Sequence, residues 1–333
     1  MALQFLKKGV QNILRDNFPP CSVLCRNPLV LVAFELDFIR AREWFLEVFE
    51  KSRADSIHVF LQLGWERETP ENSVQFAADV RDIVSACPRL KVTILANASN
   101  EVKTLSGLGL HTVLCNHNAF LDESRYPILN VPKRYDAIYI ARITPFKRHQ
   151  LAADIKSIRL IGGYYYKSDM PYKEEILDGK LAHADYSFHV KSSRIPAEIA
   201  AAHCGLCLSA AEGAMFASAE YLLCGIPVVN THNIGGRDEM FSDFSVKTVP
   251  DDPAAVAAAV AEFVRKAPPP AEIRAAVLEK MEVHRKTFRR ALNEAMAPAS
   301  FPDSRPFPHK LLLRCTKRPL ELCRYGIWHP CPR

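Results

Sequence analysis

Residues 195–231 read IPAEIAAAHCGLCLSAAEGAMFASAEYLLCGIPVVNT, and this stretch decides the fold. GLCLSA at 205–210 and PVVNT at 227–231 are short apolar runs typical of buried strands. Gly225 ends the helix-period segment between them, as a glycine at a helix C-terminus does. A strand, a helix and a strand in succession indicate a parallel sheet, and hence an α/β protein.

Short apolar runs alternate with helical spacing over most of the chain. The runs predict strands at 29–35, 56–63, 91–97, 112–117, 137–141, 157–163, 186–190, 205–210, 227–231 and 245–249. The spacing of apolar residues predicts helices at 37–53, 71–86, 253–266 and 270–297. We therefore expect two Rossmann-like, doubly wound units that face a cleft, the first of them reduced.

The polar, proline-bearing stretch LDESRYPILNVPKRYD at 121–136 interrupts this alternation and predicts a domain boundary. Ligands of doubly wound units bind at the carboxyl ends of the strands, so the candidate functional residues should follow the strands. We expect an N-terminal amphipathic segment, a first domain, a second domain and a tail of unassigned structure, at residues 1–27, 28–131, 132–297 and 298–333 respectively.

A length of 333 residues with 48% apolar residues supports more than one hydrophobic core. The net charge of +6 is a mild bias toward anionic ligands, and no zinc finger or RNP sequence accompanies it, so we expect no nucleic-acid partner. Cysteines such as Cys115 and Cys207 lie in or beside apolar stretches, and no signal peptide precedes them. This combination predicts a cytoplasmic protein with reduced thiols.

The opening MALQFLKKGVQNILRDNF at 1–18 has an apolar stripe with its charged residues off that stripe. Its longest apolar run is too short for a membrane span. It predicts an amphipathic helix that docks either on the protein's own body or, as a peripheral contact, on the inner face of a membrane.

Two cations follow the strand expected at 137–141. Arg142 closes this strand, and Lys147 lies five residues later across a proline-containing turn. Arginine supplies a planar fork of donors and lysine a mobile point charge, so together they could clamp a diphosphate. Taken alone, the turn is more typical of a solvated basic loop.

Two carboxylates follow the strand expected at 205–210. Glu212 lies on the loop, Gly213 allows close backbone approach, and a helix that starts near Ala214 would carry Glu220 on its second turn. Both carboxylates could then accept hydroxyl groups of a sugar or a ribose, although each is also compatible with an ordinary helix charge. The free N–H groups at the helix start would face an anion or a sugar hydroxyl, and they belong to Ala214, Met215 and Phe216.

A third cluster, CGIPVVNTHNIGGRDE at 224–239, runs through a buried strand into a glycine pair. Together the three clusters resemble the family 4 glycosyltransferases over residues 112–265. That family carries a G-R-[LIF]-x-x-x-K-G segment, an E-G-x-x-x-x-x-x-E pair leading into E-A-x-x-x-G-x-P-V-V, and a G-G-x-x-E turn. The matching residues here are Arg142, Lys147, Glu212, Gly213, Glu220, Gly225, Pro227, Val228, Val229, Gly235, Gly236 and Glu239.

The resemblance implies a GT-B fold and a retaining glycosyltransferase that needs no metal and no cofactor besides a nucleotide diphosphate sugar as co-substrate. The chain has no D-x-D metal motif, which agrees with this. The acceptor implied is an unidentified glycan or lipid-linked molecule, with a cell-surface polysaccharide or glycolipid as the default. By resemblance, Arg142 and Lys147 would hold the diphosphate, Glu220 the ribose hydroxyls, and Glu212 with the 213–216 backbone the transferred sugar. The catalytic candidates are thus Glu212, Arg142 and Lys147.

The chain departs from the family pattern at several positions. Arg148 stands where the family has glycine, and Tyr221 where it has alanine. The first unit lacks a glycine-rich loop after its first strand, where FELDF at 34–38 stands instead. His117 is a candidate for an acceptor-side histidine, although the family's Asn-containing turn falls at the same place and favours a structural role. His58 lies inside a strand, as a packed imidazole does.

Two other functions stay open. The reduced first unit would suit a sugar-nucleotide or glycan binding protein that has lost catalysis. A non-hydrolysing epimerase has the same architecture, but the spacing of Glu212 and Glu220 suits a transferase better. CGLC at 204–207 enters a buried strand without a second Cys pair nearby, so we interpret it as packed thiols rather than a metal site.

Overall fold

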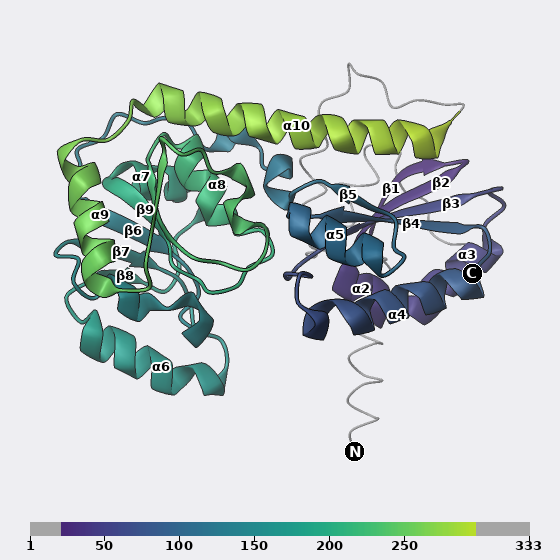
Figure 1. Cartoon of the computed structure of the whole chain (residues 1–333), viewed down its shortest axis with the longest axis horizontal. Coiled ribbons are helices and arrows are strands. Elements are labelled where there is room, and N and C mark those ends of the chain that lie inside the picture. The colour runs from purple at the N-terminus through teal and green to yellow at the C-terminus, as the bar shows by residue number, and fades with distance from the viewer. Residues whose placement is uncertain (1–20, 298–333) are drawn as a thin grey trace. The chain divides into compact units, whose positions relative to one another are not determined.

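A computed structural model describes residues 21–297 of the chain (Figure 1). The amphipathic helix predicted for residues 1–18 and the tail at 298–333 lie outside the described residues. The chain divides into two compact units. Of the described residues, the first unit comprises 21–115 together with 286–297, and the second runs from Asn116 to Arg285.

The first unit is built on a five-stranded sheet whose order follows the chain, β1-β2-β3-β4-β5. The last four strands run parallel and coincide with predicted runs, whereas β1 pairs antiparallel at the edge and was not expected from the sequence. The strands are β1 (Cys21–Arg26), β2 (Leu29–Phe34), β3 (Ile57–Gln62), β4 (Leu90–Ala96) and β5 (Thr112–Leu114).

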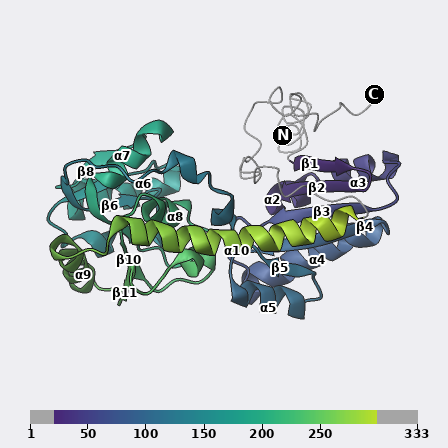
Figure 2. The same cartoon turned by 90° about the horizontal axis from the view of Figure 1, so that it is seen from above.

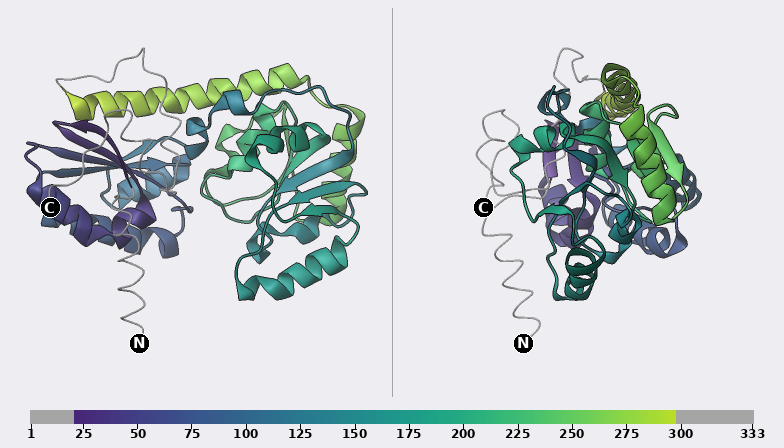
Figure 3. Two further views of the ribbon diagram at one scale, coloured as in Figure 1. Left: turned by 180° about the vertical axis from the view of Figure 1, so that it is seen from behind. Right: turned by 90° about the vertical axis from the view of Figure 1, so that its left-hand side faces the viewer.

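Helices cover both faces of this sheet. Alternate strand residues such as Leu31 and Val59 pack with Phe45 in the core under one face. On the other face, Phe288 of α10 (Pro270–Met296) lies with its ring 5.7 Å from the ring of Phe60. Figures 1 and 3 draw α10 on one face of β1–β5 and the other helices of this unit on the opposite face. The helices on the face opposite α10 are α2 (Glu35–Arg40), α3 (Arg42–Lys51), α4 (Pro70–Ala86) and α5 (Ser99–Gly107).

The helix predicted over 37–53 is two helices in the structure. Ala41 separates α2 from α3 because its φ and ψ of −100° and 23° lie outside the helical region. α5 was not predicted, because this short helix buries only Glu101 and Leu105 and so presents little apolar periodicity.

The second unit is built on a six-stranded parallel sheet of order β11-β10-β9-β6-β7-β8. The chain lays down β6, β7 and β8 in one direction and then returns past β6 to add β9, β10 and β11 in the other. The order therefore reverses between β6 and β9, the place where open parallel sheets bind their ligands. All six strands overlap predicted runs, but β9 begins three residues before the run at 205–210, and β8 shares only two residues with the run at 186–190. The strands are β6 (Tyr135–Ile140), β7 (Ile158–Ile161), β8 (Asp185–Ser187), β9 (Ala202–Cys207), β10 (Val228–Thr231) and β11 (Val246–Val249).

Helices also cover both faces of the second sheet. α8 and α9 pack against the same strands, β9 and β10, and Figures 1 and 2 draw them on opposite sides of the sheet. The predicted helices at 253–266 and 270–297 correspond to α9 and α10. The remaining helices of this unit are α6 (Met170–Glu175), α7 (Ile195–Ala200), α8 (Phe216–Leu223) and α9 (Pro253–Arg265).

The stretch at 121–136, predicted as a boundary, lies within the second unit. Arg285 of α10 donates to the carbonyl oxygens of Ala119 and Leu121 and pairs with Glu123 at 2.7 Å. Arg274 donates to the carbonyl oxygen of Glu123 at 2.8 Å. These arginines hold the stretch against α10, because a buried guanidinium must find acceptors for its donors.

Within residues 21–297, none of the helices has both the length and the apolar composition that a membrane crossing requires.

Candidate functional site

Two loops meet at the reversal of the second sheet, one after β6 and one after β9. The amide of Ala210 donates to the carbonyl oxygen of Phe146 at 3.1 Å, which joins the loops directly. A third loop, after β10, is joined by reciprocal bonds: Glu212 N–H donates to Ile234 O, and Ile234 N–H to Ala210 O, both at 3.0 Å. The carboxyl ends of β6, β9 and β10 therefore carry one connected surface, which we call the switch-point site.

Arg142 follows β6 and is half-buried. Its guanidinium carbon lies 5.6 Å from the centre of the Phe146 ring and 5.8 Å from that of Tyr166. Its Nε atom is buried without a hydrogen-bond partner, and among residues 21–297 no carboxylate pairs with it. Arg142 is thus a cation held by aromatic rings and not neutralised within the described structure.

Lys147 and Glu212 form an ion pair across the two loops. Their side chains are 12% and 10% exposed, so the pair is largely desolvated. The Lys147 Nζ atom also lies 5.1 Å from the centre of the Phe146 ring. The structure therefore brings the three catalytic candidates together: Arg142 and Lys147 share one aromatic ring, and Glu212 contacts Lys147.

Arg148 explains one departure from the family pattern. Its φ of 51° and ψ of 46° lie in the left-handed region, which glycine adopts without strain and other residues rarely adopt. Its guanidinium compensates by donating to Leu208 O at 2.6 Å, to Thr231 Oγ1 at 2.8 Å and to His232 O at 3.1 Å. It also pairs with Asp251 at 2.5 Å. Arg148 thus ties the loop after β6 to the ends of β9 and β10.

The helix expected from Ala214 begins two residues later. Met215 has the extended conformation of an N-cap, and α8 starts at Phe216. The Met215 carbonyl oxygen accepts the backbone N–H and the hydroxyl of Ser218, and these bonds turn the chain into the helix. Gly213 and Ala214 therefore belong to the loop, and the donors at the helix start are those of Phe216 and Ala217.

His117 lies beside the start of this helix. Its ring stacks on that of Phe216, with 6.5 Å between centroids, and the residue is 5% exposed. Burial lowers the pKa of His117 to about 3, which keeps the imidazole neutral at ordinary pH. Phe216 itself is 39% exposed.

Within residues 21–297, the Glu220 carboxylate has no hydrogen bond or ion pair to Arg142, Lys147 or Glu212. Its carboxylate accepts the hydroxyl of Tyr126 at 2.8 Å. Burial raises the pKa of Glu220, while the Tyr126 hydrogen bond and the nearby charge of Arg125 act in the opposite sense.

Tyr221 explains the second departure. Its ring packs directly over β9, where a Cβ on Gly205 would come within 2.2 Å of the ring. Its hydroxyl oxygen accepts the backbone N–H of Ile140 at 2.7 Å. The tyrosine is accommodated because the facing strand has a glycine at the contact.

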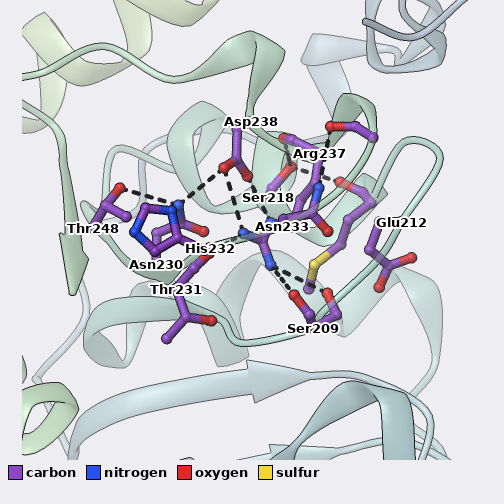
Figure 4. Close-up of polar contacts among 12 residues, drawn as sticks. Ser209, Glu212, Ser218, Asn230, Thr231, His232, Asn233, Arg237, Asp238 and Thr248 are labelled. Atoms are coloured by element: carbon purple, nitrogen blue, oxygen red, sulfur yellow. Dashed lines mark hydrogen bonds and ion pairs between the residues drawn. The ribbon is translucent and has the colours of Figure 1, made fainter. Parts of the chain in front are cut away.

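The sequence did not point to Arg237 as a site residue. It is completely buried and donates to Ser209 O at 2.7 Å and to Thr231 O at 2.5 Å, so it joins the ends of β9 and β10 (Figure 4). Asp238 pairs with its Nε at 2.7 Å. Figure 4 shows Glu212 on the loop beside this cluster, and Arg237 bonds Ser209 before this loop and Ser218 after it. The signal that the sequence offered was an arginine within the G-G-x-x-E turn, at position 237.

Exposed aromatic residues follow the next two strands, β7 and β8. Tyr165, Tyr166 and Phe188 are 64%, 62% and 45% exposed, which is unusual for rings of this size. The Phe188 ring makes edge contacts with Tyr164 at 5.3 Å and Tyr165 at 5.8 Å. Because Tyr166 also contacts Arg142, this aromatic group borders the switch-point site.

The carboxyl ends of the strands in the first unit carry buried carboxylates. Glu35, in the FELDF stretch, accepts the backbone N–H of Gly64 at 2.9 Å and two bonds from Arg67 at 3.0 and 2.8 Å. Glu101 accepts the N–H groups of Asn97 at 2.6 Å and Arg67 at 3.1 Å. Burial raises the pKa of Glu101 to about 7. Internal carboxylates therefore occupy the backbone donors that a glycine-rich loop would offer to a ligand.

Cys204 and Cys207 are both buried in β9, as packed thiols are. Burial raises the pKa of Cys207 to about 12, so its thiol stays protonated. Across the described part of the chain, no three His, Cys, Asp or Glu residues are grouped so that they could hold a metal ion.

The fold matches solved structures, although no family model and no curated protein matches the sequence. A structure of HepE from Anabaena in complex with UDP and glucose aligns with a TM-score of 0.57 at 14% identity, covering 81% of this chain and 78% of that one. TarM aligns with a TM-score of 0.59 at 12% identity, covering 80% of this chain and 54% of that one. AviGT4, a glycosyltransferase involved in avilamycin A biosynthesis, aligns with a TM-score of 0.53 at 17% identity, covering 78% and 79%.

Identities this low establish the fold and not the activity. The resemblance indicated by the sequence motifs is confirmed at that level, and so are the two parallel-sheet, Rossmann-like units. The chain therefore has a GT-B-like fold, the fold that the motifs at residues 142–239 implied.

Proposed function

We propose that this chain is a glycosyltransferase that takes its sugar from a nucleoside diphosphate sugar. The observation that carries the proposal is Arg142, a half-buried cation at the reversal of a parallel sheet with no internal carboxylate paired to it in residues 21–297. A guanidinium presents paired donors that match phosphate oxygens, and ligands of such sheets bind at this edge. The HepE structure, which was solved with UDP, has the same fold.

The proposed roles follow from the positions of the side chains. Arg142 and Lys147 would bind the diphosphate and stabilise the negative charge that develops on it as its bond to the anomeric carbon breaks. Glu212 would accept hydroxyl groups of the sugar, with the backbone at 213–216 beside it. Glu220 would accept the ribose hydroxyls, in exchange for or beside the hydroxyl of Tyr126.

The aromatic group after β7 and β8 supports a nucleotide as the ligand. Tyr165 and Phe188 present exposed ring surface next to the Arg142 side of the site. Aromatic rings stack on any nucleobase, because every base has a π-face. We propose that the base of the donor lies against this surface.

A ligand screen tests the proposal. Purified protein is heated with UDP-glucose, UDP-N-acetylglucosamine, GDP-mannose and ADP-glucose in turn, and the unfolding temperature is measured. A donor that binds the native state raises its stability by about 2.7 kcal/mol at a concentration one hundred times its Kd. The stabilising donor is then incubated with the protein, and release of the nucleoside diphosphate is followed.

Single variants assign the site. Arg142→Ala should lower the rate of nucleoside diphosphate release roughly 100-fold, the usual effect of removing one preorganised charge-stabilising donor. Arg265→Ala removes an equal charge at the exposed end of α9 and should leave the rate unchanged. If no donor raises the unfolding temperature, or if Arg142→Ala turns over like the wild type, the proposal fails.

A sugar-nucleotide binding protein without catalysis is the second candidate. One observation favours it: Lys147 is already neutralised by Glu212 and would have to leave that pair to serve a phosphate. A protein of this kind would be stabilised by a donor but would release no nucleoside diphosphate, even with a broad panel of acceptors.

A further inference from the structure

The ion pair of Lys147 and Glu212 joins two residues to which the proposed function gives different partners. Lys147 would bind a phosphate and Glu212 a sugar hydroxyl, yet in the protein alone the two side chains bind each other. The two residues are 65 positions apart in the sequence, so the fold creates the contact and helical proximity does not. The pair therefore fills, in the protein alone, the two positions at which the ligand would bind.

Burial makes this pair consequential for binding. Both side chains are about one tenth exposed, and the Phe146 ring lies 5.1 Å from the Lys147 ammonium. Water therefore screens the pair less than it screens a surface ion pair. A diphosphate arriving at Lys147 must compete with the Glu212 carboxylate for the same ammonium, and the two anions repel each other.

Arg142 is the contrasting cation. It lies against the same Phe146 ring but has no internal carboxylate paired to it in residues 21–297. A diphosphate can bind Arg142 without displacing any group. The two cations of the site are therefore not equivalent: one is available to every diphosphate, and the other only after an exchange.

We infer that Glu212 holds the place of the donor's diphosphate on Lys147, and that donor binding exchanges the partners; this inference rests on the proposed function. The phosphate takes the Lys147 ammonium, and the released Glu212 carboxylate accepts the hydroxyl groups of the sugar. A complete donor supplies both new partners. A nucleoside diphosphate without a sugar supplies only one, so it breaks the pair and leaves a buried carboxylate uncompensated.

The exchange makes the site prefer donor over product. Once the sugar has left, Glu212 regains Lys147 and helps to expel the nucleoside diphosphate. Glu212 would then act as a ligand-sensing residue as well as a sugar-binding one. Its removal should have opposite effects on the two ligands, which a residue with a purely structural role would not produce.

The test measures the Kd of UDP, GDP and ADP by calorimetry for four proteins: the wild type, Glu212→Gln, Lys147→Ala and the double variant. Glu212→Gln should bind the preferred nucleoside diphosphate roughly three- to tenfold more tightly, the range expected for freeing a lysine from an ion pair of modest net worth. The same variant should turn over the donor more slowly, because the sugar hydroxyl groups exchange a charged carboxylate acceptor for a weaker neutral amide oxygen. In the Lys147→Ala background the gain from Glu212→Gln should vanish.

Glu198→Gln is the matched control. Glu198 is also buried and pairs with Arg159 in the same unit, with side chains 7% and 6% exposed. The substitution removes the same charge without touching Lys147, so the affinity for the nucleoside diphosphate should not change. Glu212→Ala serves as a second variant if Glu212→Gln does not fold, as judged by its unfolding temperature.

The outcomes separate the two ideas. If the wild type binds a nucleoside diphosphate and Glu212→Gln binds it equally or more weakly, the exchange is wrong while the proposed function stands. A gain that persists in the Lys147→Ala background would mean simple repulsion between Glu212 and the ligand, which also overturns the exchange. If the wild type binds neither these nucleotides nor any of the four donors, both proposals fall together.

Discussion

Arg148 offers a direct measurement of backbone strain at the switch-point site. The residue has a left-handed conformation with φ of 51°, which costs a residue with a Cβ about 1–2 kcal/mol relative to glycine. Replacing it by alanine keeps that strain and removes the side-chain bonds. Replacing it by glycine removes both.

The expected energies follow from the contacts. In either variant the buried Leu208 carbonyl loses its 2.6 Å bond, and the bonds to Thr231 and His232 are lost as well. The pair with Asp251 adds little, because the Asp251 side chain is 49% exposed. Arg148→Ala should therefore lower the free energy of unfolding by about 2–3 kcal/mol. Arg148→Gly should recover about 1 kcal/mol of that loss through relief of strain.

Urea unfolding of the two variants measures the difference. The control is Glu262 in α9, which has an ion pair to Lys247 but a helical backbone. There the order should reverse, with Glu262→Gly less stable than Glu262→Ala by about 1 kcal/mol, because glycine is a poor helix former. If glycine is no better than alanine at position 148, the strain argument is refuted, and with it the reason for the family's glycine at this place.

Three further predictions concern packing, pH and ligand contact. Gly205→Ala should lower the free energy of unfolding by about 1–3 kcal/mol, because the new Cβ would meet the Tyr221 ring at 2.2 Å. In a Tyr221→Ala background the cost of Gly205→Ala should nearly disappear, and additive costs in chemical denaturation would contradict the contact. The stability of the first unit should fall as pH rises from 4.5 to about 7, by up to about 1.4 kcal/mol per pH unit. The reason is that burial raises the pKa of Glu101 to about 7, so the native state holds this proton more tightly than the unfolded chain does. Glu101→Gln should flatten the slope in pH-dependent unfolding, and an unchanged slope would rule Glu101 out as its source. Phe188→Ala should weaken binding of the preferred nucleoside diphosphate about tenfold through loss of stacking. Phe244→Ala removes an equally exposed ring in the same unit and should not weaken binding. Equal calorimetric affinities for both variants would exclude Phe188 from the base site.

Strands were the most predictable part of the fold. Runs such as PVVNT and SVKTV are rich in β-branched residues, and each forms a strand where the run lies. β1 escaped prediction because Cys21–Arg26 is only partly buried at an edge and lacks a clear apolar alternation. Helix ends were less predictable, since the start of α8 depends on the extended backbone of Met215 rather than on a capping side chain.

The candidate site was predictable in its residue types and not in its pairings. Arg142 and Lys147 follow a strand, and a strand end is recognisable in a sequence. That Lys147 pairs with Glu212, and that Arg237 bonds the backbone at Ser209 and Thr231, depends on which loops the sheet order brings together. Backbone carbonyls are present at every residue, so no sequence signal marks which of them a buried arginine will bind.

The helix α10 sets a limit on how this protein can be taken apart. Its last residues, with Phe288 among them, complete the core of the first unit. The strands of that unit all come from residues 21–115. A fragment that stops at residue 115 would leave the Phe60 ring uncovered, so the N-terminal portion cannot be expected to fold as an independent piece. Dissection or domain exchange would have to graft residues 286–296 back onto it, and residue 288 must be synthesised before the first sheet can close its second face.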